Sequence, residues 1–378
     1  MTKPRTGLVW DELYMWHHPG GGAGPIPTGG GLIEPGDLGE ESPHPRRRLR
    51  NLIEVSGLGA TLEWVTPRPV TDEELLRVHT ESYLDLIRRL SLAGGGDAGG
   101  GTPFGPLGDR IGRLAAGGCL RAVDLVLDGV LNSAYVLVKP PGHHASRESG
   151  NGHCIFNNVA LAAAHARARG MQRISILDWD VHWGNGTQDV FWADGAVQVI
   201  SLHQADWYPR GGGSSADVGI GDGLGAHINI PLPPGSGIGA YRAAFERVVL
   251  PAIRWHGADL ILVSCGFDAA ANDPSGRMLL TSDDFRLMTR WIQEVANERS
   301  GGRLVVVHEG GYSPTYVPFC GVAVIEELSG AEEIIEDPFL ARYSEVGYAD
   351  LQSLQSKAIS EVIAHHSALA TSTTGWAR

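Results

Sequence analysis

The sequence predicts an α/β protein, a single domain (1–378) of three layers in which helices cover both faces of a central, mostly parallel sheet. Two observations predict this class. From residue 111 onward, short apolar runs alternate with longer segments of helical periodicity, as in chains that place parallel strands between helices. Polar clusters also follow the ends of those runs, and ligands in such sheets bind beyond the carboxyl ends of the strands.

The N-terminal part begins with a predicted strand over 6–10. A long loop rich in Gly and Pro follows over 17–41, and loops of this length in compact domains are commonly functional. The run from Arg46 to Arg50 then leads toward a helix. We interpret these arginines as solvated.

A helix start is predicted at Thr71, because three acidic residues follow it, and 82–92 has helical spacing. A second Gly-rich loop comes next. It holds Asp97, the one acid there that could reach a ligand, although a turn residue is the more ordinary interpretation.

From residue 111 the two periodicities alternate regularly. The predicted strands are 134–138, 174–177, 197–202, 227–230, 260–264 and 304–307. The predicted helices are 111–127, 158–169, 188–192, 241–255, 282–298 (capped by Ser282), 316–328 and 351–366.

Composition excludes several classes of protein. Of the 378 residues 43% are hydrophobic and 19% charged, which is ordinary for a globular protein. No run of about 18 apolar residues exists and the N-terminus lacks a signal-peptide core, so we expect a cytoplasmic protein without a membrane partner. The formal charge of −13 disfavours nucleic acid and mildly favours cationic or neutral substrates. The four cysteines lack CxxC spacing, which favours packed thiols.

The unusual polar residues all follow predicted strand ends, so they are expected to converge on one rim of the sheet. Residues without a shared role would scatter between both ends of the strands. The five clusters are His143 and His144 after 134–138; Asp178, Asp180 and His182 after 174–177; His203 and Gln204 after 197–202; Asp268 after 260–264; and His308, Glu309 and Tyr312 after 304–307.

Asp180, His182 and Asp268 form a candidate metal site. Two carboxylates and one imidazole suit zinc, and also iron(II) or cobalt, while leaving a position open for a water whose pKa the metal lowers. Alternate residues of an extended strand point to one side, which would bring Asp180 and His182 together. The other interpretation is an Asp-rich loop with Thr187 capping a helix near Gln188.

Catalytic roles follow from side-chain chemistry. His143 or His144 could take a proton from such a water and pass it to a leaving amine. Tyr312, after two glycines, could donate its hydroxyl proton to a developing oxyanion. Taken singly, each of these residues is more often structural.

Five motifs, PPGHH, DWDVHWGNGTQ, SLHQ, CGFDA and EGGY, occur in this order between 140 and 312. With GHCIFNN, INIPLPPGSG and EGGYSPTYVPFCGVAVIEELSG they resemble the zinc-dependent histone deacetylase superfamily, in particular bacterial class II histone deacetylase-like amidohydrolases, which are related to acetylpolyamine amidohydrolases. The resemblance spans most of the chain. It implies the arginase/deacetylase fold and an enzyme that hydrolyses linear amide C–N bonds.

The resemblance also implies residue roles. Asp180, His182 and Asp268 would bind one zinc ion, His144 would be general base and acid, His143 its electrostatic partner and Tyr312 the oxyanion donor. Asp178 would pair with His143 and Asn185 with His144, and the Gly152 carbonyl would accept the substrate amide. Structural potassium is implied at two sites, one formed by Asp178, Asp180, His182, Ser201 and Leu202, the other by Phe191, Asp194 and Val197.

Three departures from the family pattern concern the surroundings of the metal, the substrate channel and its entrance. Trp183 replaces a second histidine, for which we expect altered packing beside the metal without its loss. The two phenylalanines that grip the substrate lysine fall at His153 and Tyr208, so the channel becomes polar. The Gly-rich loops at about 20–31 and 94–105, the second including Asp97, have no obvious family counterpart and would shape the entrance.

We therefore expect a zinc amidohydrolase acting on a small amide or an acylated amine, and a homo-oligomer, dimer or tetramer. The alternatives are a deacetylase of acetyl-lysine or acetylpolyamines, an enzyme cleaving a guanidino or imide group, and a catalytically silent protein that binds an acyl ligand.

Overall fold

The computed structural model describes residues 5–19, 41–344, 349–369 and 376–377. The predicted Gly-rich loop at 20–31 lies outside the described residues. Within them, one sheet of eight parallel strands runs through the molecule in the order β2-β1-β5-β10-β9-β6-β7-β8. These strands are β1 (Thr6–Val9), β2 (Glu63–Val65), β5 (Ser133–Val136), β6 (Ile174–Asp178), β7 (Val197–Gln204), β8 (His227–Leu232), β9 (Leu260–Cys265) and β10 (Leu304–His308).

The sheet confirms the predicted fold class, and only β2 among its strands was not predicted. This edge strand is three residues long and mostly exposed, so it lacks the apolar run that marks the others. A separate antiparallel pair, β3 (Gly96–Asp97) and β4 (Pro103–Phe104), forms in the second Gly-rich loop.

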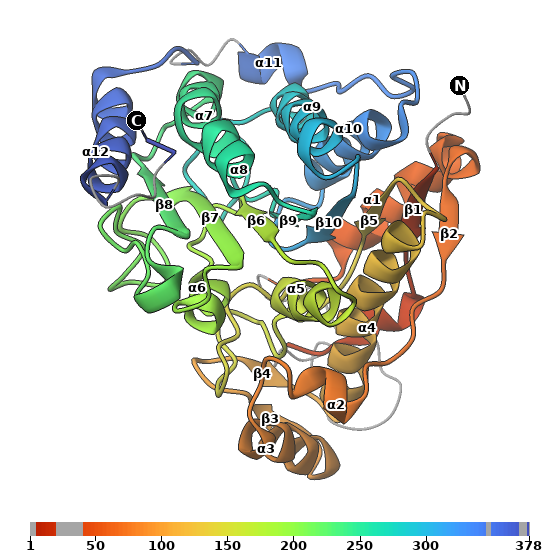
Figure 1. Cartoon of the computed structure of the whole chain (residues 1–378). Coiled ribbons are helices and arrows are strands. Elements are labelled where there is room, and N and C mark those ends of the chain that lie inside the picture. The colour runs from red at the N-terminus through yellow and green to blue at the C-terminus, as the bar shows by residue number, and fades with distance from the viewer. Residues whose placement is uncertain (1–4, 20–40, 345–348, 370–375, 378) are drawn as a thin grey trace.

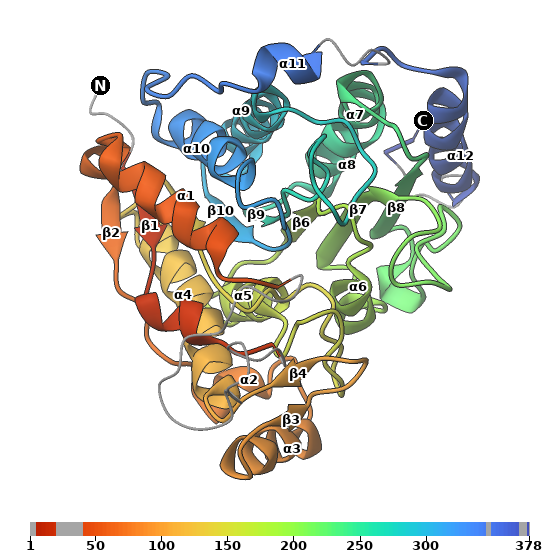
Figure 2. The same cartoon turned by 180° about the vertical axis from the view of Figure 1, so that it is seen from behind.

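Helices cover both faces of the sheet (Figures 1 and 2). One face carries α4 (Gly108–Leu127), α5 (Asn158–Ala168) and α6 (Asn185–Phe191). The opposite face carries α7 (Ile238–Ala244), α8 (Leu250–His256), α9 (Ser282–Arg299) and α10 (Val317–Ser329), with α1 (His44–Val55) beside α10 and α12 (Ser353–Leu369) beside β8. The remaining helical segments are Glu12–Trp16, Leu58–Thr61, α2 (Asp72–Leu75), α3 (Glu81–Leu92), Gly221–Gly223, the π-helical Phe245–Val249 and α11 (Leu340–Ser344).

Alternating side chains of the central strands fill two separate cores. In β9, for example, Leu260 and Leu262 pack under the α4 and α5 face, whereas Ile261 and Val263 pack under the α9 and α10 face. A strand that is buried on both sides reads as a continuous apolar run, which is why these strands were visible in the sequence.

Helix starts were predicted less accurately. Thr71 caps α2 in a capping box with Glu74, as expected. The capping box of α9, however, belongs to Thr281 and Asp284, so the expected cap at Ser282 is wrong by one residue. Thr187 lies inside α6, which begins at Asn185, and does not cap it.

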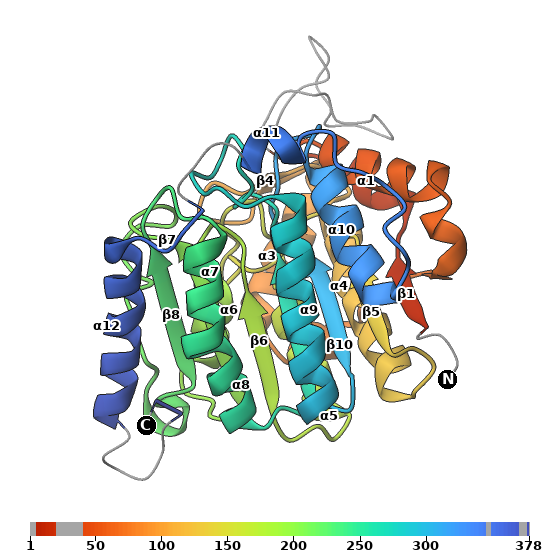
Figure 3. The same cartoon turned by 90° about the horizontal axis from the view of Figure 1, so that it is seen from above.

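The strand arrowheads in Figure 3 point to the edge of the sheet at which β4 lies. The predicted polar clusters come at or after the ends of β5, β6, β7, β9 and β10, so they lie at this edge. All four cysteines are buried free thiols, as predicted. Among the helices of the described residues, none combines the length and apolar character needed to cross a membrane.

Candidate active site and metal centre

The predicted metal ligands Asp180, His182 and Asp268 converge at this edge, with one ligand atom from each lying within 4.8 Å of the others. His182 Nδ1 lies 3.0 Å from Asp180 Oδ1 and 3.1 Å from Asp268 Oδ2. All three side chains are buried. Donor atoms of a tetrahedral zinc site, with bonds of 2.0–2.2 Å, lie about 3.3 Å apart, so the cluster has the right size and donor set.

The chain around Asp180 is a series of turns and does not continue the extended strand that we expected, because β6 ends at Asp178. Asp178 Oδ1 accepts a hydrogen bond from the backbone N–H of Asp180 (3.0 Å), and Asp180 Oδ1 accepts one from the N–H of His182 (2.9 Å). Aspartates commonly bond the backbone two residues on in this way. The turns hold Asp180 and His182 in place.

Backbone donors in the loops after β6 and β10 fix the remaining carboxylate oxygens. Val181 N–H donates to Asp268 Oδ1 (2.8 Å), and Gly310 N–H donates to Asp180 Oδ2 (2.7 Å). A Cβ at Gly310 would come within 2.1 Å of Asp268 Oδ2, so this position requires glycine. The predicted ligands are therefore oriented by the backbone that follows β10 as well as by their own loops.

The electrostatics of the cluster favour a cation. Burial, followed by repulsion from Asp180, raises the pKa of Asp268 to about 7 in the absence of metal. Two buried carboxylates this close strongly disfavour each other's charge, and a divalent ion would relieve that repulsion. The residues present thus fit a zinc ion.

The paired histidines differ in their surroundings. His143 Nδ1 bonds Asp178 Oδ2 (2.9 Å), and although burial opposes it, the charges of Asp178 and Asp180 raise the pKa of His143 well above 6.5. His144 Nδ1 bonds Asn185 Oδ1 (2.7 Å), and burial and the neighbouring His143 lower the pKa of His144 well below 6.5. The structure therefore favours a charged His143 beside a neutral His144.

Tyr312 lies beside the cluster, with its ring centroid 6.4 Å from that of His182. Its backbone is held by Asp273, whose Oδ2 accepts hydrogen bonds from the N–H groups of Tyr312 (2.7 Å) and Ser313 (3.1 Å). The sequence analysis missed Asp273. In the sequence, Asp273 is marked only by being an acidic residue five positions after the predicted ligand Asp268.

The sequence analysis named Glu309 in a polar cluster without giving it a role, and it misinterpreted Arg46. Glu309 is buried, and its Oε2 accepts hydrogen bonds from the N–H groups of Gly142 (2.6 Å) and His143 (3.2 Å). Arg46 is also completely buried, contrary to the solvated arginine that we expected. It pairs with Glu41 (2.9 Å) and donates to the Glu309 carbonyl (2.5 Å), which compensates for its burial.

The predicted substrate residues lie in three different surroundings. Gly152 and Tyr208 lie against His144, since a Cβ at Gly152 would meet the His144 ring at 2.4 Å and Tyr208 at 3.1 Å. His153 follows with a positive φ of 68° and lies near the buried His17. Asp97 is exposed and its Oδ1 accepts hydrogen bonds from Gly99 and Thr102, the arrangement of a turn residue.

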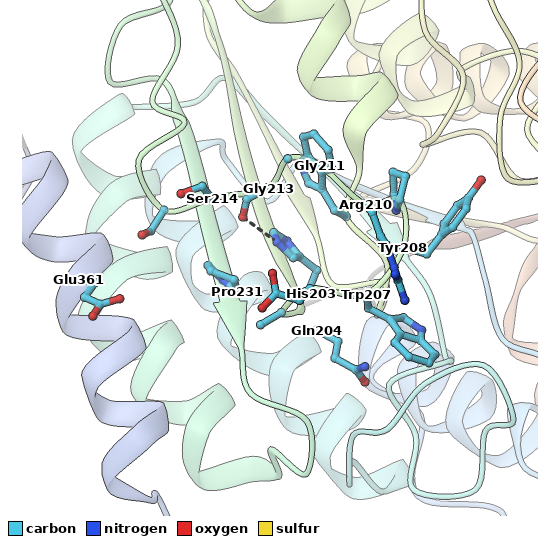
Figure 4. Close-up of a pocket in the computed structure, with 16 residues that line it drawn as sticks. His203, Gln204, Trp207, Tyr208, Arg210, Gly211, Gly213, Ser214, Pro231 and Glu361 are labelled. Carbon is cyan, nitrogen blue, oxygen red and sulfur yellow. Dashed lines mark hydrogen bonds between the residues drawn. The ribbon is translucent and has the colours of Figure 1, made fainter.

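Trp183, the residue after His182, packs against the 211–213 loop, with its ring so close to Gly212 that a Cβ there would lie 2.1 Å from it. It also borders a pocket of about 630 Å³, shown in Figure 4, whose walls include His203, Trp207 and Glu361. The predicted metal ligands do not line this pocket.

The residues implied for potassium lie on adjacent elements. Asp178 and Ser201 are partners across β6 and β7, and Leu202 follows on β7. Phe191, Asp194 and Val197 form the connection from α6 to β7, where the Phe191 carbonyl accepts hydrogen bonds from Asp194 N–H (2.8 Å) and His227 Nε2 (2.8 Å).

Comparison with known proteins agrees with this geometry. Residues 40–328 match the histone deacetylase domain family. The chain is 48% identical over 340 residues to a histone deacetylase-like amidohydrolase of Pseudomonas aeruginosa, covering 89% of each chain. It is 41% identical over 263 residues to the human polyamine deacetylase HDAC10, covering 66% of this chain and 38% of that one.

Among solved structures, the HDA15 HD domain superimposes with a TM-score of 0.82 at 29% identity, covering 96% of this chain and 95% of that domain. Motifs, fold and overall similarity therefore agree, and the chain belongs to the histone deacetylase family of amide-hydrolysing deacylases.

Proposed function

We propose that the protein is a zinc-dependent amidohydrolase that cleaves the amide bond of an acylated amine or a small amide. One observation carries this proposal: an imidazole and a phenol both lie beside the Asp180–His182–Asp268 cluster. The ring centroids of His144 and Tyr312 lie 5.9 and 6.4 Å from that of His182. A proton acceptor and a hydroxyl donor flanking a metal site are the groups that amide hydrolysis needs.

Asp180, His182 and Asp268 would hold the zinc ion. When bound, zinc would polarise the amide carbonyl and lower the pKa of a water molecule toward neutrality. Asn185 accepts the Nδ1–H of His144, which leaves Nε2 of the neutral ring free of a proton. His144 can therefore take the proton of the attacking water and later deliver it to the leaving amine. His143, bonded to Asp178, would stay charged and stabilise negative charge nearby.

Tyr312 would donate its hydroxyl proton in a hydrogen bond to the carbonyl oxygen as it becomes an oxyanion. The pKa of Tyr312 is raised well above 10 by burial and by nearby carboxylates, so it remains a protonated donor. The Gly152 carbonyl, beside His144, would accept the N–H of the substrate amide. These groups would orient the substrate and so position the scissile bond, and Asp273 would hold the backbone of Tyr312 in place.

We propose a small amide or acylated amine as substrate. His153 and Tyr208 make the channel more polar than a slot suited to a tetramethylene chain. Acetylated polyamines are the second candidate, supported by the net charge of −13 and by similarity to a polyamine deacetylase. Two structural potassium ions, at the residues named above, and a homo-oligomer remain part of this proposal by family resemblance.

The test is a panel of acylated amines and small amides, including acetyl-lysine and acetylated diamines, with zinc-loaded protein and the released amine as readout. We expect release from at least one compound, and none from protein treated with a chelator until zinc is restored. Release of urea would instead favour cleavage of a guanidino group. Zinc binding without cleavage of any compound would favour a silent acyl-binding protein.

A further inference from the structure

Tyr208 and Asn151 lie on two loops that are 57 residues apart in the sequence, and a hydrogen bond joins them. The Tyr208 hydroxyl donates to Asn151 Oδ1 at 2.5 Å. Tyr208 follows β7 and is 39% exposed, so this contact lies at the surface of the protein. In Figure 4 the Tyr208 ring extends away from Glu361 at the far side of the pocket, and its hydroxyl is at the outer end.

The Tyr208 ring lies directly over the catalytic groups. Its centroid is 5.2 Å from that of His144 and 5.9 Å from that of His182, and it stands edge-on to both imidazoles. Its edge also lies against Gly152, where a Cβ would come within 3.1 Å. The backbone carbonyl of Tyr208 accepts the N–H of Trp183 (3.1 Å), the residue after the metal ligand. The ring is therefore anchored beside the cluster.

The Asn151 side of the bond is fixed by a tight turn. Asn151 and Cys154 exchange backbone hydrogen bonds (3.2 and 2.8 Å), and both residues between them, Gly152 and His153, have positive φ. That combination is the one a type I′ turn requires. Asn151 is thus presented next to the carbonyl proposed to bind the substrate.

The second Gly-rich loop supports this turn from behind. Gly150 N–H donates to the Ala98 carbonyl (2.8 Å). A Cβ at Gly100 would lie 2.6 Å from Asn151 Oδ1, and a Cβ at Gly99 would lie 2.0 Å from Ser149 Oγ. Glycines in this loop let it approach closely enough to hold Asn151 toward Tyr208.

From this geometry we propose that the Tyr208–Asn151 hydrogen bond is a gate across the active-site entrance and a determinant of substrate size. While it is made, the bond links the two loops beside His144 and favours slim acylated amines over those whose amine chain carries a bulky group, such as a peptide, at its far end. A phenylalanine, which the family resemblance places at this position, could not form the bond. The selectivity part of this inference rests on the proposed function.

The experiment compares the parent with Tyr208→Phe, Asn151→Ala and the double variant. The measured quantity is the ratio of kcat/KM for a peptide containing acetyl-lysine to kcat/KM for an acetylated short diamine. One neutral hydrogen bond corresponds to about a 2- to 10-fold change in an equilibrium, so each single variant should raise the ratio by about that factor. The double variant should raise it no further, because both changes remove the same bond. An unchanged ratio, or fully additive effects, would overturn the proposal.

Tyr14→Phe is the matched control, since the Tyr14 hydroxyl bonds the Leu114 carbonyl on α4 and this variant should not alter the ratio. A second measurement needs no turnover: the rate at which a chelator removes zinc from the loaded protein. Both gate variants should lose zinc about 2- to 10-fold faster than the parent, by the same equilibrium argument. If the protein cleaves no amide, the proposed function is wrong. The rates of zinc removal by the chelator would still show whether the hydrogen bond acts as a gate.

Discussion

The metal cluster and the active-site entrance are built by different means, although they lie side by side. At the cluster, buried carboxylates receive backbone N–H groups from residues of several elements, Val181 and Gly310 among them. At the entrance, one hydrogen bond between the side chains of Tyr208 and Asn151 joins two loops at the surface. The cluster is thus held by several buried backbone donors, whereas the contact at the surface depends on two loop side chains, so changes at the two places should have different effects.

The largest expected effect comes from a metal ligand. Asp268→Asn keeps the shape of the side chain but removes a charge from the cluster. We expect zinc affinity to fall by more than the roughly 10- to 100-fold that loss of an outer-shell partner costs, with activity lost in parallel. Titration of zinc against a competing chelator measures this. Asp259→Asn, at the opposite end of β9, is the control, and equal zinc affinity in the two variants would contradict the assignment.

Next is Tyr312→Phe, which removes a hydroxyl and leaves the cluster intact. Turnover should fall roughly 10²-fold or more, as loss of an oxyanion donor does, while zinc content stays at the parental value. Steady-state kinetics measure the turnover, and metal analysis of the same preparation measures the zinc content. If the variant turns over substrate as fast as the parent, Tyr312 takes no part in the mechanism.

Substitutions of Glu309 test whether this residue positions the histidine pair His143 and His144. Glu309→Ala deprives the N–H groups of Gly142 and His143 of their acceptor, and we expect kcat to fall about 10- to 100-fold, the range seen for outer-shell residues. Glu309→Gln keeps an acceptor oxygen and should retain more of kcat. If the glutamine variant is as impaired as the alanine variant, the carboxylate charge matters more than the positioning.

The smallest effect is expected at the entrance. His153→Phe restores the apolar wall that the family pattern has at this position, and it should raise kcat/KM on an acetyl-lysine reporter about 10-fold, the range for a matched hydrophobic contact. A variant no better than the parent would show that His153 does not limit this substrate. It would also shift the control of selectivity toward Tyr208.

Much of the fold could be predicted from sequence. Central strands such as β6 and β9 are buried on both faces and appear as apolar runs, and the polar residues after them mark the carboxyl edge. The residues that were missed act through backbone contacts from distant segments. Asp273 holds Tyr312, and Arg46 reaches Glu309 across 263 positions of the chain. The local sequence around a residue does not show which distant residue it will contact after folding. Arg46 therefore could not be distinguished from a solvated arginine.

By itself the sequence determined the class of fold and the family, and it predicted that Asp180, His182, Asp268, His144 and Tyr312 would gather at one edge of the sheet. It could do so because side-chain type and strand periodicity are local properties. Only the tertiary structure decided how these groups are held and which loops lie beside them. The turns around Asp180, the opposite environments of His143 and His144, and the bond between Tyr208 and Asn151 each depend on segments that meet after folding. The strength of these interactions depends on burial and on distance, and neither is defined until the chain has folded.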